Sequence, residues 1–513
     1  MNPGHDGAKD HHGELLPILS ESATKMQYSR LLETPLPTFK GKYPGSPFWM
    51  KVGYFMLRRT YNSIFRTFEV TGVEKIPVDR GTLCAAWHTN GLIDPFSIIL
   101  THPKKFVVGG RHDLATRPLL GFWARKFAMQ PVVRKAELLR GGCTEEEAVA
   151  MNGRSLLNLA TGISYGYGCA LFPEGTSHSE SHLIRTKTGP MRTVLAAAAH
   201  AKATGQNIPV VMPMGLHFRK RHLFRTDCWI EYSDPIELPA ENLPEELVKS
   251  VANEEWSEPP ATDVNTLREV LTERLETLTP NREKWSEYYR DQLICHIKNR
   301  KMGLGPLSWK EEVIATRKMT GIELDPKISK LAEEIAIELD DNKLDGRDIN
   351  SKGNALRSFS PTGTLINIVK ISLLLATLPT LVYGTGLQIA VGRILGDKTD
   401  EGEDARTSYQ FLAAMFGSMF FWPVLSAILL IILFFEPTDL LPTLIHDNIG
   451  ASLFSQLLGY FISWIALIFI FYISAKIYSI SWDAIDDLFK FFRRMKLKKE
   501  VDYRINELYN LLD

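Results

Sequence analysis

Residues 87–95 read WHTNGLIDP and directly follow an apolar run, GTLCAA (81–86), that is typical of a buried strand. His88 at the end of such a strand, with Asp94 close behind it, has the composition of a general base and the carboxylate that orients it. The same residues are also a common way to end a strand and begin a helix, with Asp94 as N-cap and Pro95 at the first helical position. Taken alone, the stretch favours this second interpretation, so other segments have to decide.

Three other segments place polar residues after apolar runs in the same part of the chain. They are MQPVVRK (129–135), in which an apolar strand would deliver Arg134, LFPEGTSHSE (171–180) with RTKTG (185–189) behind it, and IPVVMPMGLHF (208–218). All of them lie at predicted strand-to-loop junctions, where open α/β sheets bind their ligands.

The segment PEGTS (173–177) has the composition of an anion-binding turn. Its glycine permits a backbone geometry that points N–H groups at an anion, and the hydroxyls of Thr176 and Ser177 add donors. Arg134, Arg185 and Lys187 could supply positive charge, since a guanidinium binds phosphate through two hydrogen bonds. By itself, however, an ordinary polar turn explains PEGTS better.

These segments need a scaffold that brings strand ends together, and the pattern from Gly72 to about Leu238 predicts one. Candidate strands alternate with candidate helices; the strands are 82–87, 105–109, 168–172, 208–213 and 228–232, and the helices are 95–101, 114–127, 144–164 and 190–203. This alternation predicts an α/β fold, a mostly parallel sheet flanked by helices. His88 would lie at its ligand-binding edge.

The order of the segments resembles the four signature blocks of the PlsC-like glycerolipid acyltransferases. The blocks are a His…Asp pair, a strand-borne arginine, FPEGTS, and a strand with an internal proline, and the resemblance covers about residues 68–240. GVEKIP (72–77) and the five residues between His88 and Asp94 are most similar to fungal-type glycerol-3-phosphate/dihydroxyacetone-phosphate acyltransferases. One departure is Ala128, six residues before Arg134, where the family usually has glycine.

The resemblance implies a membrane-bound O-acyltransferase of phospholipid biosynthesis that needs no cofactor. It would move a fatty acyl group from acyl-CoA or acyl-ACP to the sn-1 hydroxyl of glycerol 3-phosphate, with dihydroxyacetone phosphate as a possible second acceptor. His88 would take the hydroxyl proton, and Asp94 would hold its tautomer and stabilise the imidazolium. The hydroxyl would attack directly, which agrees with the lack of a GxSxG nucleophile motif.

The resemblance also indicates how the phosphorylated acceptor is held. The residues assigned to substrate binding are Arg134, Glu174, Gly175, Thr176, Ser177 and Lys187. Within this group, we expect Glu174 to orient the loop rather than to contact a like-charged phosphate. No metal is expected, because His178 and His182 are four residues apart in a polar loop and have no evident third ligand.

Two alternatives from different classes stay open. A 1-acylglycerol-3-phosphate acyltransferase uses the same four blocks on a lipid acceptor, and a catalytically silent lipid-binding scaffold could keep the fold. The chain has 59 basic and 59 acidic residues, and this balanced charge does not indicate binding of nucleic acid. The five cysteines are scattered, which is typical of a reducing compartment.

Three apolar runs, 371–392, 411–435 and 453–475, are each long enough to cross a hydrocarbon core of about 30 Å. The first contains Pro379, Gly384 and Gly386, and we expect it to bend and re-enter. The basic segment 489–500 favours the cytoplasmic side. We therefore expect a multi-pass protein of the endoplasmic reticulum or bacterial inner membrane, with the catalytic domain and the C-terminus in the cytoplasm.

These observations divide the chain into six parts. The parts are a disordered tail (1–45), an amphipathic helix (46–70), the acyltransferase domain (71–240), a charged helical extension (241–356), a membrane region (357–480) and a basic cytoplasmic tail (481–513). The helix at 46–70 carries aromatic and basic residues, which suits a membrane interface or, equally, a core-facing position.

Overall fold

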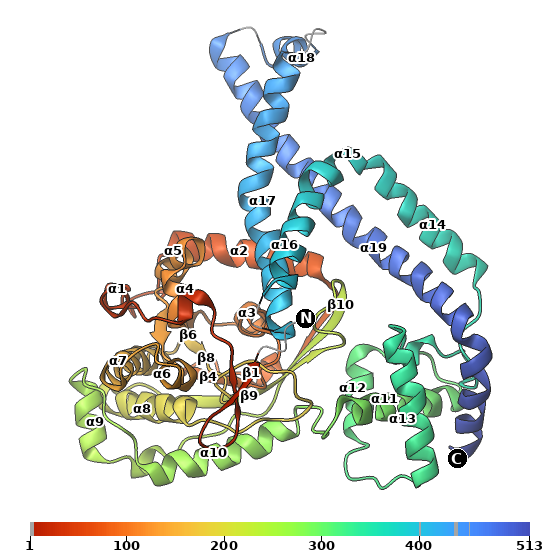
Figure 1. Cartoon of the computed structure of the whole chain (residues 1–513). Helices are drawn as coiled ribbons and strands as arrows, with labels where there is room; N and C mark the ends of the chain where they lie inside the picture. Colours follow the sequence, from red (N-terminus) through yellow and green to blue (C-terminus); the bar gives the residue numbers. More distant parts are fainter. Residues whose placement is uncertain (1–4, 400–401, 436–439, 451, 513) are drawn as a thin grey trace.

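The computed structural model describes residues 5–399, 402–435, 440–450 and 452–512. Figure 1 shows an α/β domain, a helical unit that contains the C-terminus, and helices that rise above both. The N-terminal segment, drawn in red, lies on the α/β domain.

The α/β domain is built on a six-stranded sheet with the order β3-β10-β9-β4-β8-β5. Its strands are β3 (Phe65–Thr71), β4 (Thr82–Ala86), β5 (Phe106–Val107), β8 (Gly168–Ala170), β9 (Val210–Phe218) and β10 (Thr226–Tyr232). Only the β9–β10 pair is antiparallel. The prediction of a mostly parallel sheet is therefore confirmed. A second sheet pairs β6 (Gly109–Arg111) with β7 (Gln130–Val132) in parallel.

Helices cover both faces of the main sheet, and β4 shows how the sequence divides between the two cores. Leu83 and Ala85 pack into one apolar cluster, and Cys84 and Ala86 pack into the other, because successive side chains of a strand point to opposite faces. The helices nearest the site are α2 (Pro47–Ile64), α3 (Ile93–Thr101), α5 (Pro118–Lys126), α6 (Lys135–Leu139), α7 (Glu145–Ser164) and α8 (Gly189–Thr204).

Two predicted elements have different boundaries in the structure. The helix predicted for 46–70 ends at Ile64, because residues 65–71 pair with β10 as an edge strand. The helix predicted for 114–127 is divided into α4 (His112–Thr116) and α5. Pro118 causes this break, since the residue before a proline avoids the helical region and proline suits the first turn of a new helix.

The N-terminal tail was predicted to be disordered, but residues 5–45 pack on the α/β domain; residues 1–4 lie outside the described part. The tail contains β1 (His5–Lys9), β2 (Leu15–Pro17), η1 (Glu21–Ala23) and α1 (Tyr28–Leu32). Ala23 and Leu31 are fully buried. A few apolar residues in a polar segment therefore suffice to hold it on the domain.

The charged extension does not form one unit. Helices α9 (Glu245–Ala252) and α10 (Ala261–Glu276) complete the core of the α/β domain. Helices α11 (Trp285–Lys301) and α13 (Pro326–Asp341) instead pack against the end of α19 (Leu453–Leu511), and α12 (Trp309–Arg317) packs between α11 and β10. The predicted tail 481–513 is thus the continuation of α19, and Val501, Ile505 and Leu508 are fully buried there.

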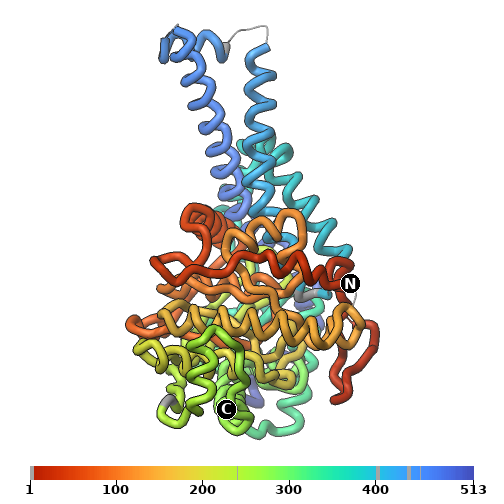
Figure 2. The backbone as a smooth tube through the Cα atoms, turned by 90° about the vertical axis from the view of Figure 1, so that its left-hand side faces the viewer, coloured from red at the N-terminus to blue at the C-terminus, as the bar shows by residue number. Residues whose placement is uncertain are grey.

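In the described part of the chain, two helices are long and apolar enough to cross a membrane, α17 (Glu403–Phe434) and α19. They stand side by side above the α/β domain in both views (Figures 1 and 2). The first predicted run lies in a bent pair, α14 (Pro361–Ala376) and the helical segment Leu378–Asp397 that ends in α16 (Leu387–Asp397), with an angle of 70° between them. The described residues therefore contain two candidate spans, or three if the bent pair is counted as one.

Candidate active site

The loop after β4 brings His88 and Asp94 together. His88 Nδ1 lies 2.9 Å from Asp94 Oδ2, and the same oxygen accepts the backbone N–H groups of Thr89 and Asn90 at 2.8 Å each. Asp94 is fully buried, whereas 15% of the His88 side chain is exposed. Since the carboxylate accepts at Nδ1, the lone pair of His88 at Nε2 is left to act as a base.

This geometry excludes the capping interpretation of WHTNGLIDP. Helix α3 begins at Ile93 with Leu92 as its N-cap, so Asp94 already lies inside the first turn. Its carboxylate turns back to the loop and holds the histidine. The ring of His88 also stacks on Phe172, with 3.9 Å between ring centroids and 17° between planes. The imidazole is therefore fixed at one end by a carboxylate and on one face by an aromatic ring.

Glu174 connects the two loops of the site. Its carboxylate is fully buried and accepts the backbone N–H of His88 at 2.8 Å and that of Ile184 at 3.0 Å. Its other contact is His178 Nε2 at 2.7 Å. Glu174 is not among the residues that line the cavity described below. Its hydrogen bonds connect the His88 loop with the loop that follows β8.

The glycine turn and the arginine reach one cavity with the histidine. Gly175 has a positive φ of 74°, which favours glycine, and it is followed by Thr176 and Ser177. Arg134 precedes α6, where its Nε donates to the buried Glu137 at 2.6 Å. Together with His88, these four residues line a single cavity. Lys187 is not part of this lining; its Nζ pairs with Glu14.

Ala128 explains why a glycine is usual six residues before the arginine. Its φ is +50°, in the left-handed region that L-residues other than glycine rarely adopt. The chain turns sharply there between α5 and β7, which carries the backbone toward Arg134. Alanine adopts this conformation at a cost in backbone strain. The loop therefore keeps its turn although the sequence departs from the family pattern.

The cavity has a volume of about 360 Å³, and most of its lining is apolar. Its apolar residues include Met56, Leu57, Phe96, Ile99, Leu120, Trp123, Phe127, Leu412, Met415, Phe416 and Met419. They come from α2, α3, α17 and α5 with the residue that follows it, so an apolar chain would fit beside the imidazole.

Helix α17 is the part of the site that the sequence did not predict. Ser408 Oγ accepts the backbone N–H of Leu92 at 2.9 Å, and Thr407 Oγ1 donates to the carbonyl of Arg221 at 2.7 Å. Arg221 in turn donates to the carbonyls of Thr89 and of His178, both at 2.7 Å. One basic side chain and the beginning of α17 thus contact the His88 loop.

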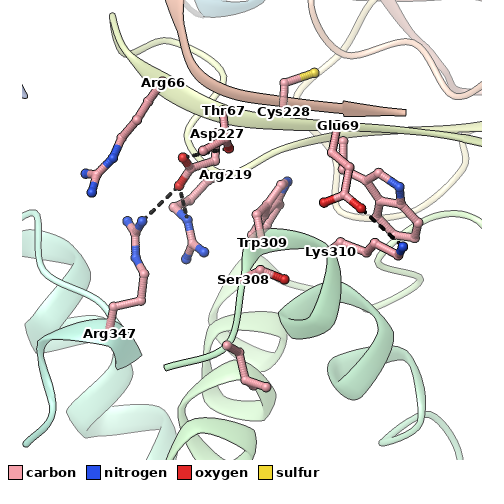
Figure 3. Close-up of a pocket in the computed structure, with 12 residues that line it drawn as sticks. Arg66, Thr67, Glu69, Arg219, Asp227, Cys228, Ser308, Trp309, Lys310 and Arg347 are labelled. Atoms are coloured by element: carbon pink, nitrogen blue, oxygen red, sulfur yellow. Dashed lines mark hydrogen bonds and ion pairs between the residues drawn. The ribbon is translucent and has the colours of Figure 1, made fainter. Parts of the chain in front are cut away.

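A second cleft, of about 210 Å³, lies between the sheet edge and the helical unit (Figure 3). Figure 3 shows Asp227 at its centre, where it accepts from Thr67 at 2.9 Å, Arg219 at 3.0 Å and Arg347 at 2.8 Å. Arg219 also pairs with the buried Glu312 at 2.6 Å. The charges of this cleft therefore join two parts of the protein.

The two histidines of HSESH lie apart from any metal-like arrangement. His178 pairs with Glu174, and His182 Nδ1 lies 3.3 Å from the carbonyl oxygen of Arg282. Within the described part of the chain, no group of three or more His, Cys, Asp and Glu residues is arranged to hold a metal ion.

The fold and the site define an α/β domain that holds a histidine–aspartate pair at the edge of an apolar cavity. Residues 67–215 match the family model described as Acyltransferase, and they form a domain of this PlsC-like family. This agrees with the order of the four sequence blocks.

Two yeast proteins are similar to parts of this chain. Glycerol-3-phosphate O-acyltransferase 1 of Saccharomyces cerevisiae is 35% identical over 71 residues, which are 14% of this chain and 9% of the relative. Glycerol-3-phosphate O-acyltransferase 2 of the same organism is 28% identical over 146 residues, or 28% of this chain and 18% of the relative. The chain thus matches less than a fifth of each relative.

Among solved structures, the 1-acyl-sn-glycerophosphate (LPA) acyltransferase PlsC from Thermotoga maritima aligns with 43% of this chain and 79% of its own length. The two are 18% identical in sequence, and the TM-score is 0.28.

Proposed function

We propose that the protein is a membrane-bound O-acyltransferase that acylates the sn-1 hydroxyl of glycerol 3-phosphate from acyl-CoA or acyl-ACP. The observation that carries this proposal is the His88–Asp94 pair beside a largely apolar cavity. The names of the two yeast relatives support glycerol 3-phosphate as the acceptor. Dihydroxyacetone phosphate, which offers an equivalent primary hydroxyl, would be a second acceptor.

The reaction follows from the position of His88. Its Nε2 takes the proton of the acceptor hydroxyl as the oxygen attacks the thioester carbonyl and forms a tetrahedral intermediate. Asp94 stabilises the imidazolium through Nδ1. The intermediate then collapses, the C–S bond breaks, and the imidazolium returns the proton to the leaving thiolate. The products are an acyl ester and a free thiol, and no acyl-enzyme is formed.

The remaining residues of the cavity hold the two substrates. Arg134 and the hydroxyls of Thr176 and Ser177 would bind the acceptor phosphate, with Gly175 allowing its close approach to the backbone. The acyl chain would lie against the apolar wall, where Leu412 and Phe416 of α17 face the cavity. The membrane helix would then form part of the binding site for the donor.

An acyl-transfer assay with defined acceptors tests this proposal. The purified protein would be incubated with palmitoyl-CoA or oleoyl-CoA and with labelled glycerol 3-phosphate, dihydroxyacetone phosphate or lysophosphatidate. We expect the highest kcat/KM with glycerol 3-phosphate. Turnover of lysophosphatidate alone would instead identify a 1-acylglycerol-3-phosphate acyltransferase, and the absence of turnover with all three would favour a lipid-binding scaffold.

We further propose that α17 and α19 are the only full membrane spans among the residues that the structure describes. Both α14 and α16 descend from the bend beside α15 (Leu378–Thr380), so their far ends lie on the side of the catalytic domain (Figure 1). Asp397 at the end of α16 pairs with Arg406 of α17 at 2.7 Å. The bent pair would thus enter the membrane and return. The catalytic domain and the basic end of α19 would both face the cytoplasm.

Cysteine labelling in sealed vesicles distinguishes this topology from three plain crossings. Cysteines would replace Lys398, Asp447 and Tyr503 one at a time, with the wild-type chain as the labelling control. We expect a membrane-impermeant reagent to reach positions 398 and 503 from the cytoplasmic side and position 447 from the opposite side. Three plain crossings predict the reverse at every position.

A further inference from the structure

Strands β1 and β2 form an antiparallel hairpin that lies on the α/β domain but pairs only with itself in the described part of the chain. None of residues 5–17 is buried. The segment that follows is anchored differently, because Ala23 and Leu31 are fully buried and Met26 nearly so. The hairpin therefore lacks the apolar burial that would fix it, and polar contacts hold it.

These contacts are made with basic residues. Asp6 accepts two hydrogen bonds from Arg140, at 3.0 Å from Nη1 and 2.9 Å from Nη2. Glu14 pairs with Lys187, and the ring of His11 lies 3.1 Å from Lys135 Nζ. We call Lys135, Arg140 and Lys187 the basic rim.

Two residues of the basic rim, Lys135 and Lys187, are neighbours of residues that line the cavity. Lys135 directly follows Arg134, which lines the cavity beside His88. The stem of Lys187 passes Gly175 so closely that a Cβ built on that glycine would lie 3.4 Å from Lys187 Cγ. The hairpin thus contacts two basic side chains that are next to the cavity lining, Lys135 through His11 and Lys187 through Glu14.

We propose that the basic rim binds phosphate groups of a substrate and that the N-terminal hairpin covers it as an autoinhibitory strap. The carboxylates of Asp6 and Glu14 occupy the places that phosphate oxygens would take. This inference rests on the proposed function, because acyl transfer brings phosphates from two sources, the acceptor and a coenzyme A donor. A phosphate dianion displaces carboxylates from such pairs readily, since exposed ion pairs are individually weak.

Ligand binding without turnover tests the proposal. The double variant Asp6→Asn/Glu14→Gln removes both carboxylates from exposed or half-exposed positions, and Glu21→Gln is the control, since Glu21 is exposed just beyond the hairpin. Calorimetry on the full chain in detergent would measure the Kd of coenzyme A and of glycerol 3-phosphate separately. We expect the Kd of at least one ligand to fall on the order of 3- to 10-fold in the double variant only.

The pattern identifies the source of the phosphate. Tightening of coenzyme A alone assigns the basic rim to the donor, and tightening of glycerol 3-phosphate alone assigns it to the acceptor. In turnover assays the double variant should lower the KM of that substrate and leave kcat unchanged. An unchanged Kd for both ligands overturns the proposal. Failure of the proposed function is distinct, because it would abolish turnover in the wild-type chain without altering this comparison of binding.

Discussion

The two clefts of the α/β domain contain similar residue types and use them differently. At the end of β4, His88 lines the cavity while Asp94 holds its Nδ1, and the two carboxylates that bind the loop, Asp94 and Glu174, are buried. In the cleft at the sheet edge, Asp227 accepts from two guanidinium groups and a hydroxyl. Charges that satisfy one another join parts of a protein, whereas a base left open beside an apolar wall is available for a substrate.

The largest expected effect is on the rate of acyl transfer, and it concerns the cavity at the end of β4. Asp94→Asn would present an amide in place of the carboxylate at His88 Nδ1 and favour the wrong tautomer. We expect kcat to fall by about 10⁴-fold, as in other His/Asp pairs. Steady-state kinetics measure the fall, and thermal unfolding of the same preparation shows whether the fold is retained.

A matched change in the other cleft should affect stability instead. Asp227→Ala removes the carboxylate between Arg219 and Arg347, two cations that are then only partly compensated. Breaking a buried pair costs about 3 kcal/mol. Denaturant unfolding should show this loss, while kcat per folded molecule stays within about twofold of wild type. A large fall in kcat would mean that this cleft takes part in the reaction.

A fall in pH should weaken the same contact between the sheet edge and the helical unit. Burial raises the pKa of Glu312, but Arg219 and His296 outweigh it and lower this pKa to about 2, below its usual 4.5. A depressed carboxyl pKa stabilises the fold above pH 4.5, and this contribution is lost as the pH falls toward 2. We expect a loss of about 3 kcal/mol over that window, and Glu312→Gln should flatten the pH dependence. An equally steep profile in that variant would contradict the assignment.

In the cavity, Arg134→Ala should raise the KM of the phosphorylated acceptor more than that of the acyl donor. Loss of one charge-assisted phosphate contact costs about 1.5–3 kcal/mol, equivalent to roughly 10- to 150-fold in KM. Initial rates with each substrate varied in turn give the two KM values. A larger effect on the donor would place the acceptor phosphate elsewhere.

The smallest effect concerns the turn before Arg134. Ala128→Gly removes the backbone strain of a positive φ, but it also increases the conformational entropy of the unfolded chain. The two effects nearly cancel, so we expect a free energy of unfolding within about 0.5 kcal/mol of wild type. Ala128→Val should cost more than about 1 kcal/mol, since a β-branched residue is a poor fit in the left-handed region. Thermal unfolding separates the two variants, and equal stabilities would exclude strain at this position.

Local patterns predicted much of the α/β fold and the motifs of the site. The end of β4 with His88 and the turn at Gly175 are short segments whose conformation follows from neighbouring residues. Their partners are remote: Glu174 contacts a loop 86 residues earlier, and Ser408 contacts Leu92 across 316 residues. No periodicity in a single segment indicates such pairings.

The boundaries that were wrong have the same cause. Residues 65–71 continue the amphipathic pattern of α2, and only pairing with β10, far along the chain, makes them a strand. Helix α19 is a different case, because a local signal was present. No glycine or proline occurs after Gly459, so nothing ends the helix where its composition changes from apolar to basic.

The most direct test of the account is the turnover of His88→Ala with glycerol 3-phosphate and palmitoyl-CoA. We expect acyl transfer to fall to the background rate, while membrane insertion and thermal stability stay near wild type, because the His88 ring lies at the cavity rather than inside the core. Acyl transfer near the wild-type rate by a folded His88→Ala protein would contradict the central claim that this imidazole is the base.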